Sequence, residues 1–501
     1  MMQDTTDQRG VASKPDRNAS IDNVSSSISD VEKSTLHSGT PPNDDIEKLI
    51  IDPLNPRNWS NSKRWTNFGL VFFNSLIGYF TSSVYMPATE NLREYFDTSL
   101  TTINATIALF IFVVGAAPLV WAPLSERVGR RWVYTIAMAL YTVFTIICGV
   151  ATNLGLFFAM RILQGIASSA GMAVGGGTVA DLFAPHERGK AMSLFMLSVI
   201  IGPAFAPIVG GYVAQYLGWR WIFYISAMFG GAIFIADLLL LRETLYRPQQ
   251  EQQAQQKPDN GARRSFKSQL QELKFNPLKS LALLLRPDVF LICMPISFAF
   301  GWFFLLVTIL PSTYAGNYDF ETGSLGLLYL TGGIGNSSGS LVAGIVADRL
   351  YARQMKSNNG VFKQESRLTP LYLGVPFLIG GFLIYGWFLE SHLHWFTPLV
   401  GYLFTTFGSM YTITTGTTYL VESYLQLSAS VVSVSNFTRG VLSMISSLLA
   451  VQIRGSLGDG WTYTVAALTL LVMYSACIPC VQVYGERMRA AKPWWQKRSQ
   501  Q

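Results

Sequence analysis

Long apolar stretches recur along the whole chain, and they constrain the fold more than any other feature of the sequence. An α-helix needs about 20 apolar residues to cross the ~30 Å hydrocarbon layer of a membrane. Twelve such stretches can be placed, at residues 66–87, 103–123, 133–151, 155–182, 191–217, 221–242, 287–315, 324–347, 368–389, 394–423, 428–452 and 460–484. Only 13% of the residues are charged, roughly half the share that is usual in soluble domains. The sequence therefore predicts an all-α membrane protein with twelve transmembrane helices.

Lysine and arginine are distributed unevenly between the loops. If the N-terminus is cytoplasmic, the loops on that side hold nineteen Lys and Arg residues, Arg242 included. The opposite loops hold only Arg93, Arg220 and Arg454. Because positively charged loops stay in the cytoplasm, we expect both termini to be cytoplasmic. The formal net charge of +7 reflects the same bias, and we expect no nucleic-acid partner.

Polar segments divide the chain into five parts. Residues 1–62 are rich in Ser, Asp and Asn and contain no apolar signal segment, so they are predicted to form a disordered cytoplasmic tail. Residues 243–286 include a Gln-rich stretch and are predicted to form a central cytoplasmic loop. This loop separates a six-helix bundle at 63–242 from a second one at 287–484, and a basic cytoplasmic tail follows at 485–501.

Two short motifs recur in both bundles at a constant offset of six helices. APLSERVGRR at 122–131 matches GIVADRLYAR at 344–353 in the spacing of a small residue, an acid and an Arg. TVADL, which contains Asp181, matches YLVES, which contains Glu422. Duplicated bundles that move about a site at the membrane midplane are typical of secondary transporters. We therefore expect two pseudo-symmetric six-helix bundles.

The first of these motifs places several charges between two apolar stretches. Acids and arginines that meet at helix ends stabilise one arrangement of the helices and separate in another, as a gate requires. The predicted cytoplasmic gate comprises Glu126, Arg127, Arg130, Arg131 and Asp181, with Asp348 and Arg349 opposite. The alternative interpretation is a turn whose positive charge only orients the chain.

Several segments together resemble the major facilitator superfamily. The motif at 122–131 looks like the loop signature of that family, RILQGIASSAG like the Arg-bearing motif of its proton-coupled members, and IGPAFAPIVGG like the Gly/Pro motif of its antiporters. GWRWIFYI, ADLFAPHERGKA and LRET resemble the twelve-span fungal drug:proton antiporters, and YLTGGIGNSSGS, GTTYLVES and SVSNFTRG resemble the quinidine-resistance group within them. The resemblance covers roughly residues 52–484. It implies the major facilitator fold and proton-coupled export.

The resemblance also implies roles for particular residues. Arg161 and Gln164 would couple proton and substrate, and a Gly/Pro group on the fifth span would seal the cavity against leak. That group comprises Gly202, Pro203, Pro207, Gly210 and Gly211, which also predict a kinked, closely packed helix. The first span holds no carboxylate, so the proton carriers available are Asp181, Asp237 and Glu422.

Charged residues deep in a membrane need a partner or a water-filled cavity. The two deepest charges, Arg161 and Arg439, are both cations. A cavity of positive potential favours an anionic or amphiphilic substrate. Further candidates for the substrate cavity lie near the middle of their spans: Asn74, Trp302, Tyr411 and Asn436. For each of these four residues, helix packing is the alternative role.

Signatures of enzymes occur only in the wrong context. Gly335 to Gly339 match G-x-S-x-G, and Cys477 to Cys480 match C-x-x-C, but both lie inside apolar stretches without the strands that these motifs need. No Walker A sequence is present. We expect neither enzymatic activity nor a cofactor, and His392 and His394 in a short outer loop suggest a weak metal site at most.

These patterns predict a secondary transporter that exports small organic molecules, such as drugs, toxins or metabolites, in exchange for protons. A dedicated organic-anion or metabolite carrier on the same scaffold is the first alternative, and a membrane receptor without transport is the second. We expect a monomer in the plasma membrane, with the vacuolar membrane as the alternative location.

Overall fold

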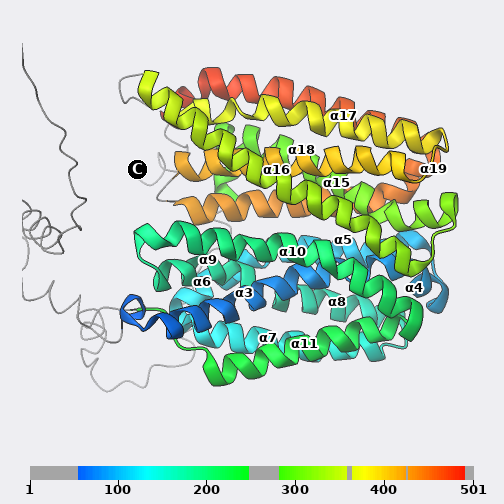
Figure 1. Cartoon of the computed structure of the whole chain (residues 1–501), viewed down its shortest axis with the longest axis horizontal. Helices are drawn as coiled ribbons and strands as arrows, with labels where there is room; N and C mark the ends of the chain where they lie inside the picture. The colour runs from blue at the N-terminus through cyan, green and yellow to red at the C-terminus, as the bar shows by residue number, and fades with distance from the viewer. Residues whose placement is uncertain (1–54, 247–280, 358–363, 425–426, 491–501) are drawn as a thin grey trace, which may run out of the picture. The chain divides into compact units, whose positions relative to one another are not determined.

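The computed structural model describes residues 55–246, 281–357, 364–424 and 427–490 (Figure 1). Most of the predicted N-terminal tail, most of the predicted central loop and the end of the C-terminal tail lie outside the described residues. The chain separates into a small unit, Met1–Asn58, and a large unit, Trp59–Gln501. Of the small unit, the structure describes a short 3-10 turn, η1 (Pro56–Asn58). All further statements concern the large unit.

The large unit is helical wherever it is described, and it consists of two halves. The elements of the first half are α3 (Asn61–Ser83), η2 (Met86–Ala88), α4 (Thr89–Tyr95), α5 (Leu100–Ala116), α6 (Pro118–Val128), α7 (Arg130–Val150), α8 (Leu154–Ser168), α9 (Ala170–Leu182), α10 (Pro185–Leu217) and α11 (Trp219–Leu240). Those of the second half are η3 (Ala282–Leu285), α15 (Pro287–Tyr318), α16 (Thr322–Ser357), η4 (Gln364–Leu368), α17 (Leu371–Glu390), α18 (Phe396–Ser423) and α19 (Ser428–Ala490).

Most of these helices are apolar and long enough to cross a membrane. Eight described helices meet that criterion, and the bent pair α5 and α6 makes a ninth. The more polar α16 and α18 are also long, with 36 and 28 residues. The continuous segment α19 consists of two helices that meet at Gly458, where the backbone leaves the helical conformation. With these additions, the described helices correspond to the twelve predicted ranges.

Two spans contain breaks that the sequence analysis did not predict. The fifth span, for which a kink was predicted, is one continuous helix. The second span bends by 41° between α5 and α6, where Pro118 starts the new helix and cannot donate a backbone hydrogen bond. The fourth span is divided into α8 and α9 at Ser169. The fifth span, α10, runs without a break although Pro203 and Pro207 lie inside it.

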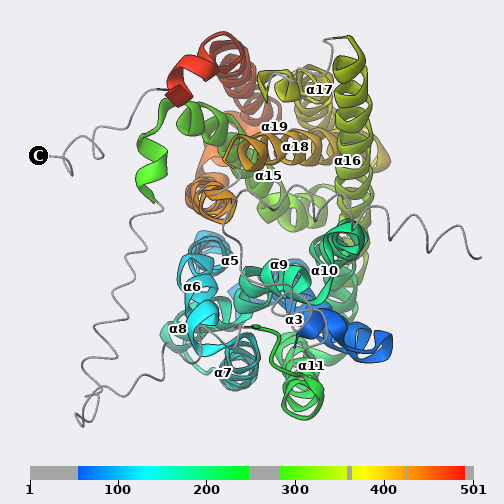
Figure 2. The ribbon, with the colours of Figure 1, turned by 90° about the vertical axis from the view of Figure 1, so that its left-hand side faces the viewer.

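The two halves touch mainly through two pairs of helices. We call the end where α3 begins and α11 ends the inner end, and the opposite end the outer end. Helix α5 packs on α19, and α10 packs on α16, whereas α6 and α9 have little contact with the second half (Figure 2). Buried apolar residues form one cluster through the second half and the outer end of the first half. The inner end of the first half has a separate cluster, so the halves share a core only toward the outer end.

Two tight turns between helices use the same device. Gly129 has a φ of 107°, and the next two backbone N–H groups donate to the Glu243 carboxylate at 2.8 and 3.2 Å. Gly458 has a φ of 77°, and the N–H groups of Asp459 and Gly460 donate to the Glu390 carboxylate at 3.0 and 3.1 Å. Glycine reaches this conformation without strain, and each carboxylate satisfies N–H groups that a helix start leaves unpaired.

Candidate functional site

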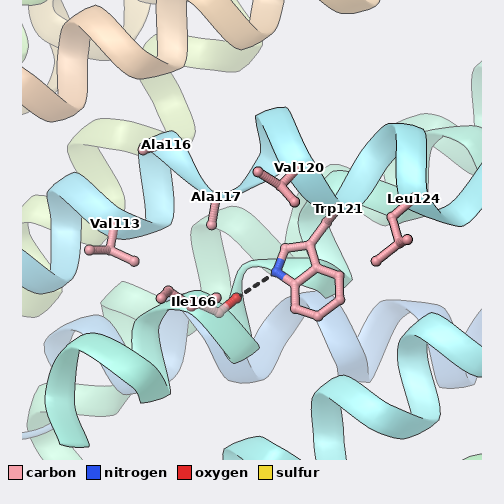
Figure 3. Close-up of a pocket in the computed structure, with 7 residues that line it drawn as sticks. All are labelled: Val113, Ala116, Ala117, Val120, Trp121, Leu124 and Ile166. Atoms are coloured by element: carbon pink, nitrogen blue, oxygen red, sulfur yellow. Dashed lines mark hydrogen bonds between the residues drawn. The ribbon is translucent and has the colours of Figure 1, made fainter. Parts of the chain in front are cut away.

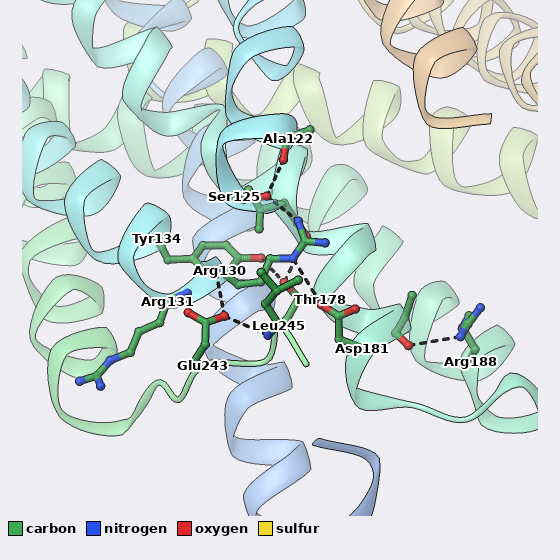
Figure 4. Close-up of polar contacts among 12 residues, drawn as sticks. Ala122, Ser125, Arg130, Arg131, Tyr134, Thr178, Asp181, Arg188, Glu243 and Leu245 are labelled. Carbon is green, nitrogen blue, oxygen red and sulfur yellow. Dashed lines mark hydrogen bonds and ion pairs between the residues drawn. The ribbon is translucent and has the colours of Figure 1, made fainter. Parts of the chain in front are cut away.

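A polar network at the inner end of the first half is built around Arg130 (Figure 4). The Arg130 guanidinium forms an ion pair with Asp181, with 3.3 Å between Nε and Oδ2, and also donates to the Ser125 hydroxyl. Its backbone N–H is held by Glu243. Arg130 begins α7, Asp181 lies near the end of α9 and Glu243 follows α11. The network therefore joins α6, α7, α9 and the segment after α11 at one level.

Other residues of the predicted gate lie around this network. Arg131 is anchored on the far side of the turn, where its guanidinium donates to the Leu238 carbonyl at 2.9 Å. Glu126 and Arg127 are exposed at the end of α6. Sequence reasoning missed Glu243, because a single acid after the sixth span carries no local signal of a contact with residues 112 and 113 positions away.

The second half contains a matching ion pair. Arg367 donates to Glu422, with 2.7 Å between Nε and Oε2, and also to the Ala347 carbonyl. Arg367 lies shortly before α17, whereas Arg130 is the first residue of α7. Glu422 is next to last in α18, as Asp181 is in α9. Asp348 and Arg349, which the motif comparison selected, are exposed, and neither belongs to an ion pair of the described residues. Sequence reasoning missed Arg367. Its place as the last cation before the ninth span was a signal that could have identified it.

Asp237 differs from the two gate carboxylates in its surroundings. It is completely buried on α11, and the Asn74 amide on α3 lies 3.0 and 2.9 Å from its two oxygens. None of the ion pairs between described residues includes Asp237. Asp237 and Asn74 thus form a buried carboxyl–amide pair inside the first half.

Arg161 is enclosed by aromatic rings in the first half. Only 1% of its surface is exposed, and the guanidinium carbon lies 4.2 Å from the ring centres of both Tyr85 and Phe110. One guanidinium nitrogen donates to Gln164, whose amide donates to Thr145 at 2.7 Å. Nε and the other terminal nitrogen have no hydrogen-bond partner in the described part of the chain. Ring faces attract the cation here in place of a carboxylate.

Arg439 lies on α19 next to the boundary between the halves. Its guanidinium donates to Asn436 and stands 5.2 Å from the Phe300 ring centre. Its neighbour Asn436 lies against the first half, because a Cβ atom at Gly115 of α5 would lie 2.8 Å from the Asn436 carbonyl oxygen. Its Nε is buried without a partner among the described residues. The structure thus brings together Asn436 and Arg439, two of the predicted cavity residues.

The remaining predicted cavity residues occupy separate places. Trp302 lies on α15, and its indole nitrogen is buried without a partner within the described segments. Tyr411 is fully buried and packs closely against Gly374 of α17. Asn74 faces Asp237 inside the first half.

The three glycines of the Gly/Pro group on α10 lie close to neighbouring segments. A Cβ atom at Gly202 would lie 2.8 Å from the Tyr79 Cβ, and one at Gly211 would lie 2.7 Å from the Thr322 carbonyl oxygen. At Gly210, a Cβ would overlap the Val84 carbonyl oxygen at 1.5 Å. Helix α10 therefore touches both α3 and the second half through backbone atoms.

An apolar groove of about 500 Å³ lies beside the break between α5 and α6 (Figure 3). It is lined by Val113, Ala116, Ala117, Val120, Trp121, Leu124 and Ile166. The Trp121 indole N–H donates to the Ile166 carbonyl at 2.7 Å. None of the predicted cavity residues lines this groove. The described residues also contain no cluster of three or more His, Cys, Asp or Glu that could hold a metal ion.

Helices long enough to cross a membrane, arranged in two halves with matching ion pairs at one end, define a membrane transporter. The chain belongs to the Major Facilitator Superfamily, whose family model matches residues 71–447. The protein is therefore an integral membrane protein of a transporter family and is not an enzyme.

Curated relatives of this family match most of the chain. The efflux pump radE of Floropilus chiversii is 32% identical over 452 residues, which are 88% of this chain and 83% of that protein. The MFS-type transporter hepF of Aspergillus oryzae is 32% identical over 87% of this chain and 92% of its own. The uncharacterized transporter C1529.01 of Schizosaccharomyces pombe is 31% identical over 88% of this chain and 91% of its own.

Solved structures show the same fold at low sequence identity. A bacterial homologue of the human lysosomal transporter Spinster, in an inward-facing and unoccupied conformation, aligns with a TM-score of 0.58 and 12% identity. It covers 86% of this chain and 98% of its own. A D-xylose–proton symporter aligns with a TM-score of 0.60 and 14% identity, over 82% and 97% of the two chains.

Proposed function

We propose that this protein exports small organic molecules in exchange for protons by alternating access of a site between its two halves. The efflux pump and the transporters among its relatives support transport and export. Proton coupling is supported by one observation above all, which is the buried Asp237 carboxyl without a cation partner among the described residues.

Three carboxylates were candidates for the proton carrier, and their surroundings rank them. Asp181 and Glu422 each face an arginine, so their negative charge is balanced in this structure. Asp237 has only the neutral Asn74 amide beside it. An unbalanced charge at membrane depth costs on the order of 3 kcal/mol, so gain and loss of a proton at Asp237 would change the energy of the first half most.

Arg161 and Gln164 would couple this proton to movement of the helices. The Arg161 charge is held by the rings of Tyr85, which precedes η2, and of Phe110 on α5. Helix α5 is one of the two helices of the first half that touch the second half most extensively. A change in the field around Arg161 would therefore reach the boundary between the halves through α5.

The substrate would bind near Arg439 and Asn436 and would be anionic or amphiphilic. Arg439 is flanked by the Phe300 ring and has no carboxylate partner among the described ion pairs. A cation beside an aromatic ring suits a substrate that combines an oxygen acceptor with an apolar body. Trp302 and Tyr411 remain proposed members of the cavity wall.

The two inner ion pairs would act as the cytoplasmic gate. Arg130 with Asp181 ties the start of the third span to the end of the fourth, and Arg367 with Glu422 ties the segment before the ninth span to the end of the tenth. Each ion pair fixes the positions of the helix ends within its own half. The inner ends of the two halves can then meet as preformed surfaces when the gate closes. Asp348 and Arg349 would add charge to the exposed surface of the same end.

The test is transport by purified protein in sealed vesicles with an imposed pH gradient. The probes are a fluorescein carboxylate and a rhodamine cation of similar size. We expect the gradient to drive transport of the carboxylate, and Asp237→Asn to reduce that transport to the level seen without a gradient. The isosteric control is Asp97→Asn, because Asp97 is exposed in an outer loop with a φ of 46°, which asparagine tolerates.

Three results would each overturn a part of the proposal. Transport that ignores collapse of the gradient by an ionophore would remove proton coupling altogether. Equal gradient dependence of Asp237→Asn and Asp97→Asn would keep the coupling but assign it to another residue. Preference for the rhodamine cation would overturn the proposed substrate class alone.

A further inference from the structure

A side chain at the outer end connects the two halves with both ends of its amide group. Gln215 lies in the last turn of α10, and its Nε2 donates to Glu321 Oε2 at 2.7 Å. Its Oε1 accepts the backbone N–H of Gly323 at 2.9 Å. Because one end donates and the other accepts, the amide has a single orientation that satisfies both contacts.

The acceptor contact satisfies a group that α16 cannot satisfy itself. Gly323 is the second residue of α16, and the first N–H groups of a helix have no partner within it. Gln215 thus caps a helix of the second half from a helix of the first. A Cβ at Gly323 would lie 2.3 Å from Gln215 Oε1, so only glycine allows this approach.

The backbones of α10 and α16 are in contact around this bridge. A Cβ at Gly211 would lie 2.7 Å from the Thr322 carbonyl oxygen, and one at Gly326 would lie 2.3 Å from the Pro207 carbonyl oxygen. Such contacts exist only when the outer ends of the two helices are pressed together. They must separate if the halves swing apart at the outer end.

We propose that Gln215 and Glu321 form an outer clasp that holds the outer end shut while the inner end is accessible. The clasp rests on alternating access as part of the proposed function, but it needs neither the proton nor the substrate. Its hydrogen bond to Glu321 joins two exposed side chains, and such a bond contributes little to stability. Its bond to the Gly323 N–H is partly buried. The clasp therefore biases the closed state and can still open in every transport cycle.

The two residues offer a test in which they exchange places. In Gln215→Glu, two carboxylates face each other and the donor to Glu321 is lost. In the double variant Gln215→Glu with Glu321→Gln, the amide and the carboxylate exchange sides. The carboxylate introduced at position 215 is then able to accept from both the new amide and the Gly323 N–H, so the clasp is rebuilt. A structural loss of Gln215 alone would not be repaired in this way.

The readout is the rate at which a membrane-impermeant maleimide labels Ser83→Cys from the outer side. Ser83 is 5% exposed at the outer end of α3 and precedes η2, which touches α15 and α16. All variants carry Cys480→Ala, because the other three native cysteines are buried. The control is Gln452→Glu, which adds the same charge at an exposed position of α19.

We expect Gln215→Glu to raise the labelling rate about tenfold, which is the effect of losing the hydrogen bond to Glu321 and placing two carboxylates next to each other. The exchanged pair should return to within about twofold of the parent, and Gln452→Glu should not differ from it. An unchanged rate in Gln215→Glu, or an equally raised rate in the exchanged pair, would overturn the clasp. If Gln215→Glu does not fold, Glu321→Ala serves instead, with a smaller increase expected because this variant places no second carboxylate at the clasp. Labelling without added substrate or gradient separates this result from the test of proton coupling.

Discussion

Single residues in this protein acquire their roles from neighbours that are distant in the sequence. Asp181 and Arg130 were predicted to meet, and they form an ion pair, since each ends or starts a span at the same level. The pairing of Asp237 with Asn74, 163 positions away, had no counterpart in the sequence analysis, because periodicity places a residue on a helix but does not choose the helix that it faces. Arg367 was missed for a related reason, since the second motif aligns with Asp348 and Arg349 and not with the residue that precedes α17.

Gly171 makes a prediction at this scale. A Cβ there would lie 2.1 Å from the Asn74 carbonyl oxygen, so Gly171→Ala must push α9 away from α3. We expect the free energy of unfolding to fall by about 1–3 kcal/mol, as in other overpacked sites. The midpoint of thermal unfolding in detergent should fall with it. Gly176→Ala on the same helix is the control, because the nearest atom to its Cβ would be 3.8 Å away. Equal midpoints for the two variants would mean that α3 and α9 can separate freely.

At the scale of elements, the second span shows how one proline divides a helix. The sequence analysis placed a continuous helix at 103–123, because the composition remains apolar through Pro118. In the structure, α5 packs along α19, and the second span then bends by 41° at this proline. Proline is acceptable at the start of a helix as well as at a kink, so its presence alone did not decide between a gentle curve and a break.

Straightening this span should move its inner end. Pro118→Ala restores an N–H group that can continue the hydrogen-bond ladder from α5 into α6. Since α6 has 11 residues and rises ~1.5 Å per residue, its tip can move by up to about 10 Å. Val128 and Leu427 are both exposed at the inner end. The distance between spin labels at Val128→Cys and Leu427→Cys should be shorter in Pro118→Ala than in the parent protein. Pro287→Ala, at the first position of the unbent α15, should leave the distance unchanged, and an unchanged distance in Pro118→Ala would locate the cause of the bend elsewhere.

At the scale of the whole molecule, contacts between the halves are concentrated toward one end. The shared apolar core, the contacts of η2 and the clasp at Gln215 all lie at the outer end. The ion pairs of Arg130 and Arg367 each remain within one half at the inner end. The proposed alternating access requires such an arrangement, in which the halves are held together mainly toward the outer end.

The orientation in the membrane can be tested with two exposed positions. Ser391 follows α17 at the outer end, and Arg353 lies near the end of α16 at the inner end. With Cys480→Ala as background, we expect an impermeant maleimide to label Ser391→Cys in intact cells and Arg353→Cys only after permeabilisation. The reverse pattern would refute the cytoplasmic placement of the termini. Labelling of both only after permeabilisation would place the protein in an internal membrane.

The sequence by itself determined the number of spans, their division into two similar halves and the positions of most charged residues. These properties follow from local hydrophobicity, which reports whether a segment can leave water regardless of its neighbours. Only the tertiary structure decided that Arg367 faces Glu422 and that Glu243 binds the backbone at the start of α7, because helix packing brings these residues together. It also decided that Asp237 has no such partner among the described residues and that Gln215 reaches across the two halves.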